Sequence, residues 1–248
     1  MNLISVIIPT KNRNDLLNKA VLSVLMQTYE NWELLIINDY GNKIKLDYGD
    51  SRIKIINNKY IKGGNGARNT GIALSKGNFI AFLDDDDEWE KEKLKKQLHV
   101  MKNSDAILCY TGKNIYHKSS FKKSSFKKAY FSPRVTLNFH NYIGTTSSVF
   151  IRSEIIKLKK YKFDESINIL QDYDFYLQLC DLGKFIGIKE NLVTYHYNPK
   201  RKHVSLNLSV LFDSVKKILI KQKGIFKLII LPGLIIISIQ KIYNYFRF

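Results

Sequence analysis

Short apolar runs rich in Ile, Leu and Val alternate with amphipathic segments across residues 1–110. The apolar runs predict buried strands at 3–8, 32–37, 53–56, 79–83 and 106–110, the first of them stopped by Pro9. Between them, apolar residues recur at helical spacing and predict helices at 14–25, 63–74 and 90–101. This order predicts an α/β fold, with a mostly parallel central sheet and helices on both faces.

The pattern is less regular after residue 110. It predicts a strand at 144–151, a helix at 171–182, short strands at 185–188 and 192–197, and an amphipathic helix at 207–222. The Ser- and Lys-rich segment 118–128 predicts a loop or flap, and residues 113–134 as a whole have no assigned role. We therefore predict one domain over 1–205, with halves at 1–110 and 111–205, and a helical tail at 206–248.

Charge is large and unevenly placed. The chain carries 40 Lys and Arg against 22 Asp and Glu, a formal net charge of +18. Such an excess suits binding to nucleic acid, anionic lipid or a phosphorylated substrate. For the middle of the chain, the alternative is that its many lysines reflect only a Lys-rich composition. Cys109 and Cys180 have no metal-binding spacing and predict two buried free thiols. The first residues lack the basic segment of a signal peptide and predict the first strand instead.

Five acidic residues follow a predicted buried strand without interruption, from Asp84 to Glu88. Adjacent carboxylates repel one another, and a bound cation removes that cost. Hard oxygen ligands suit Mg²⁺ or Mn²⁺, held by one or two carboxylates together with substrate phosphates. An acidic cap for the next helix is the alternative, but one or two acids satisfy that role. In parallel sheets ligands bind at the carboxyl ends of strands, and this run stands at such an end.

Other candidate residues are weaker on spacing alone. Asp39 ends the second strand and suits either a nucleotide contact or a turn before Gly41. The glycines at 63–66 match neither a P-loop nor a dinucleotide fingerprint and predict a turn that opens a helix, whereas Arg68 beside them can pair with a diphosphate. Asp172 opens a predicted helix, either as a cap or as a general base.

Taken together, these segments resemble the family 2 glycosyltransferases, which have the nucleotide-sugar-binding GT-A fold. The matching stretches are SVIIPTKNR (5–13), SVLMQTYENWEL (23–34), GARNTGIA (66–73), FIAFLDDDDEW (79–89), SSVFIR (147–152), FDE (163–165) and QDYD (171–174). The match covers roughly residues 3–200 in order. Each motif alone is weak, but six or more in register are specific.

The resemblance implies a role for each matching position. Asp39 would contact the nucleoside, expected to be uridine, and Asp84 and Asp85 would approach the nucleoside and ribose. Asp86 would bind the metal that bridges the diphosphate, while Thr10 and Arg13 would line the nucleotide pocket. Asp172 would be the base that deprotonates the acceptor. Residues 1–110 become the nucleotide-binding half and 111–205 the acceptor-binding half. Three positions depart from the family pattern: Asn38 and Tyr40 beside the uracil site, and Gln171 before the base.

The tail has an uncharged apolar stretch, 228–240, interrupted by Pro232 and Gly233. It is too short for a spanning helix, which needs about 20 apolar residues. Basic and aromatic residues flank it, at positions 216, 217, 221, 223, 227, 241, 243, 245, 246 and 248. The pattern favours an anchor at an anionic membrane interface, with a helix hairpin that packs on the catalytic domain or in a dimer as the alternative.

The function expected from these features is inverting transfer of a hexosyl or N-acetylhexosaminyl group. The donor is a UDP-sugar or a related nucleotide-sugar, the cofactor Mn²⁺ or Mg²⁺, and the acceptor a glycan or lipid-linked glycan. This suits assembly of a bacterial surface polysaccharide or lipooligosaccharide, in the cytoplasm at the inner face of the cell membrane, without a nucleic-acid partner. A homodimer stays open. The alternatives are a nucleotidyltransferase that makes a nucleotide-sugar and a non-enzymatic, basic nucleic-acid-binding protein.

Overall fold

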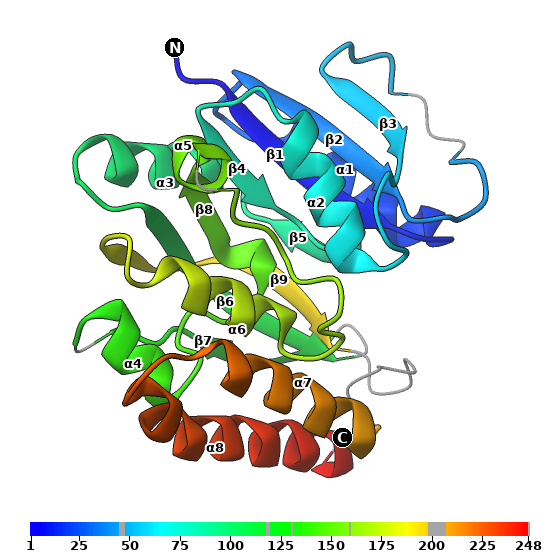
Figure 1. Cartoon of the computed structure of the whole chain (residues 1–248). Helices are drawn as coiled ribbons and strands as arrows, with labels where there is room; N and C mark the ends of the chain where they lie inside the picture. The colour runs from blue at the N-terminus through cyan, green and yellow to red at the C-terminus, as the bar shows by residue number, and fades with distance from the viewer. Residues whose placement is uncertain (45–47, 118–119, 130, 159, 198–206, 248) are drawn as a thin grey trace.

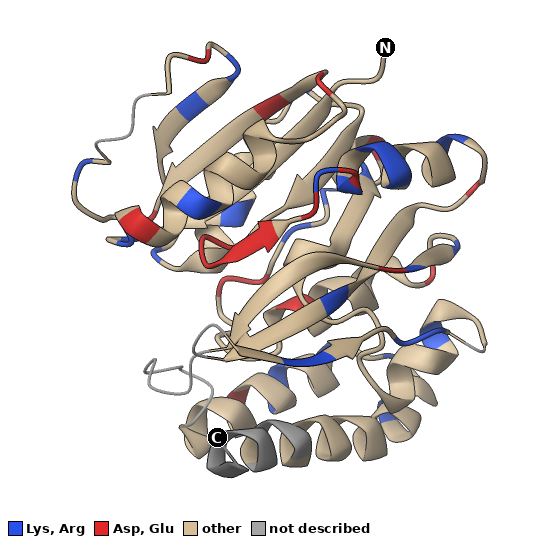
Figure 2. Cartoon of the chain, turned by 180° about the vertical axis from the view of Figure 1, so that it is seen from behind, with Lys and Arg blue, Asp and Glu red and all other residues tan. Residues whose placement is uncertain are grey.

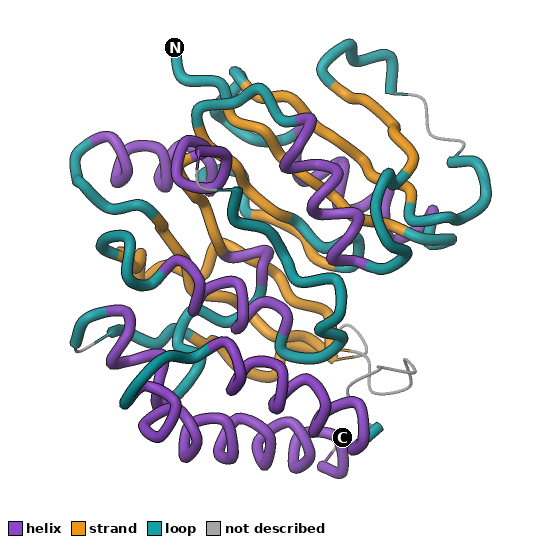
Figure 3. Tube along the Cα trace, viewed as in Figure 1, coloured by secondary structure: helices purple, strands orange, loops and turns teal. Residues whose placement is uncertain are grey.

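A computed structural model describes residues 1–44, 48–117, 120–129, 131–158, 160–197 and 207–247. Its centre is one nine-stranded sheet in the order β3-β2-β1-β4-β8-β6-β9-β5, with β7 paired to β6. The strands are β1 Ile4–Thr10, β2 Trp32–Asn38, β3 Ile53–Asn57, β4 Phe79–Phe82, β5 Asp87–Trp89, β6 Leu108–His117, β7 Ser120–Ser125, β8 Val149–Arg152 and β9 Phe185–Tyr197. The helices are α1 Asn14–Leu25, α2 Gly64–Leu74, α3 Lys93–Lys102, α4 Pro133–Phe139, α5 Ser153–Leu158, α6 Gln171–Leu179, α7 Leu208–Lys221 and α8 Phe226–Arg247 (Figures 1 and 3).

The α/β prediction is confirmed. Strands β1 to β4 pair in parallel, and successive side chains of β1 enter different cores because a strand points alternate residues to opposite faces. Val6 and Ile8 pack with α1 and α3, whereas Ile7 packs with α2 and α6. Helices therefore cover both faces of the sheet. Both cysteines are buried free thiols, as predicted.

Strand β1 does not stop at Pro9 as predicted but continues to Thr10. The carbonyl of Ile7 accepts a hydrogen bond from Leu83 on the β4 side, and that of Thr10 accepts one from Asp39 on the β2 side. Backbone groups of successive residues in a strand point alternately to its two neighbours, so the nitrogen of Pro9 points to the β4 side. It lies just beyond the hydrogen bond between Leu83 and Ile7, the last one between β4 and β1. A proline is tolerated there because no N–H is required.

The second half of the sheet is mixed. Strand β8 runs antiparallel between β4 and β6, while β9 is parallel to β6 and antiparallel to β5. The expected loop at 118–128 is wrong for 120–125, which pair with β6 as β7, and correct for 126–128, while 118–119 lie outside the described residues. The two strands predicted at 185–188 and 192–197 are one strand, β9, with a register shift opposite Gly112. The acidic run itself contains β5, and α4 and α5 were not predicted.

The tail forms two helices that pack on the second half of the domain (Figure 1). Pro232 and Gly233 do not break α8, which runs through both. Gly233 lets α8 approach α4 closely, because a Cβ there would lie 1.9 Å from the carbonyl oxygen of Asn138. The inner side of α8 is buried, while an outer stripe of Leu228, Leu231, Ile235, Ile236 and Ile239 is exposed.

Among the described residues, no helix combines the length and the apolar character needed to cross a membrane. The predicted flanking side chains at 241, 243, 245, 246 and 248 lie outside the described part of the tail. The hairpin alternative is therefore correct for the inner face of α8.

A lysine is buried under the sheet in the first turn of α3. Lys93 is fully inaccessible to solvent; its Nζ donates a 2.6 Å hydrogen bond to Gln97 Oε1 and lies 4.0 Å from the centre of the Trp89 ring. Burial lowers the pKa of Lys93 to about 7. The ammonium loses its hydration when it is buried in the folded state, whereas water solvates it in the unfolded chain, so the charged form destabilises the fold.

We predict that Lys93→Met raises the free energy of unfolding at pH 7. The unfolded pKa is about 10.4, so between pH 7 and 10 the unfolded chain holds the extra proton and wild-type stability rises with pH. Below pH 7 the full cost, on the order of 4 kcal/mol, is present. Leaving Gln97 without its donor costs about 1 to 3 kcal/mol, so we expect a net gain of about 2 kcal/mol at pH 7 and a loss near pH 10.

Urea unfolding at pH 7 and pH 9.5 measures both effects. Lys102→Met, at an exposed position of the same helix, is the control and should change stability by less than about 0.5 kcal/mol. A Lys93→Met variant that is less stable than wild type at pH 7 contradicts the account.

Candidate active site

A cavity of about 770 Å³ opens at the carboxyl ends of β1, β2 and β4. It brings together all the predicted site residues: Thr10, Arg13, Asp39, Arg68, Asp84, Asp85, Asp86 and Asp172. Figure 2 shows acidic residues gathered in the middle of the molecule, where the two halves of the sheet meet. The structure thus places in one space residues as far apart in the sequence as Thr10 and Asp172, which are 162 positions apart.

Three carboxylates of the acidic run form a cluster that can hold a metal. One oxygen from each of Asp84, Asp86 and Asp87 lies within 4.8 Å of the others. Asp87 is buried; its Oδ2 accepts a 2.6 Å hydrogen bond from Ser147, while its Oδ1 has no hydrogen-bond partner among the described residues. Burial, with the charge of Asp84, raises the pKa of Asp87 to about 8. A dication supplies the missing partner, and three hard oxygens suit Mg²⁺ or Mn²⁺.

Asp85 points away from this cluster toward the first half of the domain. Its Oδ2 accepts a 2.7 Å hydrogen bond from Thr10 Oγ1, and its Oδ1 accepts one of 2.9 Å from the Arg13 guanidinium. Burial raises the pKa of Asp85, and the Arg13 charge and the Thr10 hydroxyl oppose this shift. Both oxygens are engaged, so Asp85 fixes Thr10 and Arg13 on the cavity wall.

Arg68 joins the metal cluster to the glycine turn. Its Nη2 lies 2.6 Å from Asp84 Oδ1, and the side chain is buried. Nε and Nη1 have no hydrogen-bond partner among the described residues. These two donors are themselves buried, and it is the positive charge of the guanidinium beside Asp84 that suits an anion such as a diphosphate. Gly64 keeps space beside it, because a Cβ there would lie 3.0 Å from Nη1.

Asp39 fixes the same glycine turn from the end of β2. Its Oδ1 accepts hydrogen bonds from the backbone N–H of Gly63 at 2.8 Å and from Asn58 Nδ2 at 2.9 Å. Gly63 has a φ of +136°, which suits glycine. Oδ2 accepts no hydrogen bond from a described residue. The turn before Gly41 is held by Asn38, whose Oδ1 accepts the Gly41 N–H at 3.1 Å, so Asp39 does not form the predicted turn and instead holds the turn at Gly63.

Asp172 lines the same cavity from the first turn of α6. Its Oδ2 is 3.4 Å from Asn141 Nδ2. The preceding Leu170 is buried with a left-handed φ of +65°, an unusual backbone conformation for a branched residue. This conformation turns the chain into the first turn of α6, from which Asp172 reaches the cavity.

Sequence patterns did not indicate several cavity residues. Lys113, Thr146 and Tyr195 line the cavity but belong to no motif, and Glu165 lines it too although the FDE stretch that it ends had no assigned role. Thr146 Oγ1 donates to Asp84 at 3.1 Å, and Glu165 accepts from the backbone of Ile61 at 3.0 Å. These contacts join distant segments. The one local signal was the acidic run, which already contained Asp87.

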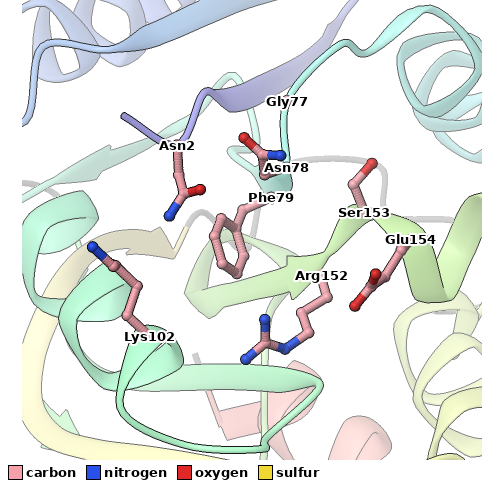
Figure 4. A pocket seen from close by; sticks show the side chains of 8 residues that line it. All are labelled: Asn2, Gly77, Asn78, Phe79, Lys102, Arg152, Ser153 and Glu154. Carbon is pink, nitrogen blue, oxygen red and sulfur yellow. The ribbon is translucent and has the colours of Figure 1, made fainter.

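A second hollow, of about 440 Å³, lies at the opposite edge of the sheet (Figure 4). Arg152 lines it, but its guanidinium already donates to the carbonyl oxygens of Met101, Ser104 and Ala106 at 2.7 to 2.9 Å. The neighbouring Lys102 and Glu154 do not form an ion pair with each other in the structure. The reactive groups are thus concentrated at the carboxyl-end cavity.

Known proteins resemble this chain in both sequence and fold. Residues 5–158 match the model of glycosyl transferase family 2. The UDP-Glc:alpha-D-GlcNAc-diphosphoundecaprenol beta-1,3-glucosyltransferase WfgD of Escherichia coli is 41% identical over 122 residues, 48% of each chain. The match therefore spans about half the length of that relative. The putative colanic acid biosynthesis glycosyl transferase WcaA of Escherichia coli K12 is 30% identical over 211 residues, 79% of this chain and 73% of the relative.

A structure of Staphylococcus aureus TarS in complex with UDP-GlcNAc superposes with a TM-score of 0.74 at 16% identity, over 94% of this chain and 72% of that one. This likeness supports the GT-A fold. Because the family model covers more than half of the 248 residues, the chain belongs to glycosyl transferase family 2.

Proposed function

We propose that this protein transfers a sugar from a UDP-sugar to an acceptor hydroxyl, with inversion at the anomeric carbon, in the assembly of a bacterial surface polysaccharide. The observation that carries the proposal is one cavity that brings a metal-binding cluster and a candidate base together. The carboxylates of Asp84, Asp86 and Asp87 lie close to one another, with the Arg68 guanidinium paired to Asp84. Asp172 lines the same cavity.

The donor is assigned from the cavity residues near Asp39 and from the relatives. Asp39 offers a free oxygen to a base or ribose, and Thr10 and Arg13 are fixed beside it by Asp85. The TarS structure contains UDP-GlcNAc, and the name of WfgD specifies UDP-Glc. These observations support a uridine nucleotide. Asn38 donates to the carbonyl of Asn42 at 3.2 Å, so this departure from the family holds the turn beside the proposed uracil site.

The acid cluster is proposed to hold Mn²⁺ or Mg²⁺ through Asp84, Asp86 and Asp87. Such an ion, when bound, supplies positive charge to the donor diphosphate. A mannosyltransferase from Pyrobaculum calidifontis, described in complex with GDP-Man and Mn²⁺, shares the fold with a TM-score of 0.66 at 13% identity. Arg68 adds a second positive group in the same cavity and, through Asp84, orients the cluster.

The chemical step needs a base opposite the leaving group. Asp172 accepts the proton of the acceptor hydroxyl, and the acceptor oxygen forms its bond to the anomeric carbon as the bond from that carbon to the β-phosphate oxygen breaks. The electron pair of the broken bond stays on the diphosphate. Attack from the side opposite the leaving group inverts the anomeric carbon, which requires that donor and base occupy opposed walls.

The acceptor is proposed to be a lipid-linked glycan bound by the half at 111–205. Ile167, Ile169 and Leu170 form an apolar part of the cavity, and Ile237 of α8 also lines it. The names of WfgD and of its relative WfaP, also from Escherichia coli, specify a diphosphoundecaprenol-linked acceptor. An apolar wall supplied by the tail suits an acceptor whose lipid lies at a membrane.

The outer stripe of α8 is proposed to rest on the anionic inner surface of the cell membrane. Its five residues are 41 to 73% exposed and follow one side of the helix, and an apolar stripe of this kind is a binding surface. Lys227 is exposed in the first turn of the same helix and Lys223 is exposed just before it, and residues 199–248 hold ten Lys and Arg against one acid. This charge favours anionic lipid over a second copy of an equally basic chain.

We predict that Asp86→Ala lowers Mn²⁺-dependent UDP affinity by about 100-fold, because it removes one ligand of the cation that grips the diphosphate. Isothermal calorimetry with and without EDTA measures the loss. Asp105→Ala is the control, since Asp105 and its partner Lys184 are both more than 70% exposed. If wild type and Asp86→Ala bind UDP equally, Asp86 does not hold the cation.

We predict that Asp172→Asn retains UDP affinity within about threefold but loses transfer by about 10² to 10⁴, because an amide cannot accept the proton. Transfer is measured as radiolabelled sugar on a lipid-linked acceptor. A transfer rate close to that of wild type removes Asp172 from the role of base.

We predict that the partition coefficient onto phosphatidylglycerol vesicles is at least about tenfold lower for the double variant Leu231→Glu, Ile235→Glu than for wild type, because two charges replace apolar contacts. Co-sedimentation measures the partition. Leu158→Glu, 81% exposed on α5, is the control. Unchanged sedimentation, or a wild-type dimer that the double variant abolishes, overturns the membrane assignment.

A further inference from the structure

Lys113 enters the active-site cavity from the second half of the domain. It lies on β6, directly after a register shift in the pairing of β6 with β9 at Thr111 and Gly112. Such irregularities redirect side chains next to functional sites. Lys113 accordingly lines the same cavity as Asp84 and Asp172.

An aromatic ring faces the ammonium group. Nζ lies 4.6 Å from the centre of the Tyr195 ring, a favourable cation–π distance. Nζ forms no hydrogen bond and no ion pair with any described residue. Lys113 is half-buried and its ammonium faces a cavity lined by carboxylates, a position that suits an anionic ligand with which it can pair.

The carboxylates around Lys113 locate that ligand. Burial lowers the pKa of Lys113, while the charges of Asp87, Asp172 and Asp84, in that order, raise it. Its strongest electrostatic neighbours therefore belong to the metal cluster and to the proposed base. On the proposed function, the anomeric carbon and the β-phosphate lie between these two groups.

A charge count shows what an ammonium adds at this point. Asp84, Asp86 and Asp87 carry three negative charges when all are ionised, and a dication together with the Arg68 guanidinium would balance them. The donor diphosphate brings further negative charge, and the ammonium of Lys113 is left to face it. As the bond from the anomeric carbon to the phosphate oxygen breaks, its electron pair adds a further negative charge to the diphosphate. A cation already in place stabilises that charge without reorganisation.

We propose that Lys113 is a catalytic residue that contacts the β-phosphate of the donor and stabilises the departing diphosphate. This inference rests on the proposed function and extends it, because Lys113 lies outside every motif that relates the chain to its family. Two other roles compete with it. Lys113 can merely neutralise Asp87, or it can contact the acceptor.

Comparison of UDP with UMP tests the proposal, since only UDP has a β-phosphate. In calorimetry with Mn²⁺, we expect Lys113→Met to lower the affinity for UDP by at least about tenfold and the affinity for UMP by less than about twofold. Transfer should fall by about 100-fold or more. Lys113→Arg should recover part of the UDP preference. Lys123→Met, at an exposed position of β7, is the control and should behave as wild type.

The outcomes separate the competing roles. Equal weakening of UDP and UMP assigns Lys113 to neutralising Asp87, and unchanged UDP affinity with a raised acceptor KM assigns it to the acceptor; either result overturns the proposal. Should Lys113→Met not fold, as judged by thermal unfolding, Lys113→Gln repeats the comparison with a polar side chain. Wild type that binds neither nucleotide refutes the proposed function itself, which is a distinct result.

Discussion

Burial of several carboxylates at one point is the constraint that organises this molecule. Asp87 is almost inaccessible, lies near Asp84 and Asp86, and has an oxygen without a partner. Like charges in a poorly solvated place are tolerated only if cations face them. Arg68 forms an ion pair with Asp84, and Lys113 adds a second positive charge nearby. A bound dication would add more positive charge, and the phosphates of a substrate would then balance the total charge of the site.

The sheet topology is what makes this arrangement reachable. The parallel half ends β1, β2 and β4 at one edge, where turns present Thr10, Asp39 and Asp84. The chain then leaves that edge into β5, which pairs with β9 of the second half and so takes the acidic run across the junction. Strand β6 pairs with both β8 and β9. The acidic run consequently faces groups from two independently wound halves of one sheet.

Local patterns predicted the parallel half well, because each of its strands and helices is defined by its own residues. The acidic run was likewise visible as a motif. The second half depends on pairing between distant segments, which periodicity does not report. Strand β7 is polar and exposed and has the composition of a loop, yet β6 gives it a partner. Lys113 is one of many lysines in a basic segment, and only the register shift of β6 distinguishes it.

The tail shows how one helix can serve two surfaces. On α8, Ile237 is 6% exposed and lines the active-site cavity, whereas Ile235 and Ile239 are at least half exposed on the outer side. A helix turns 100° per residue, so positions two apart point to opposite sides. If the outer side rests on lipid, as proposed, Ile237 on the inner side lies one helix diameter, about 10 Å, from the bilayer surface. A lipid-anchored acceptor would then have only a short distance to cover between the membrane and the cavity wall. The close contact of Gly233 with α4 fixes the place of the helix, because any larger residue there would push α8 away from the cavity it helps to line.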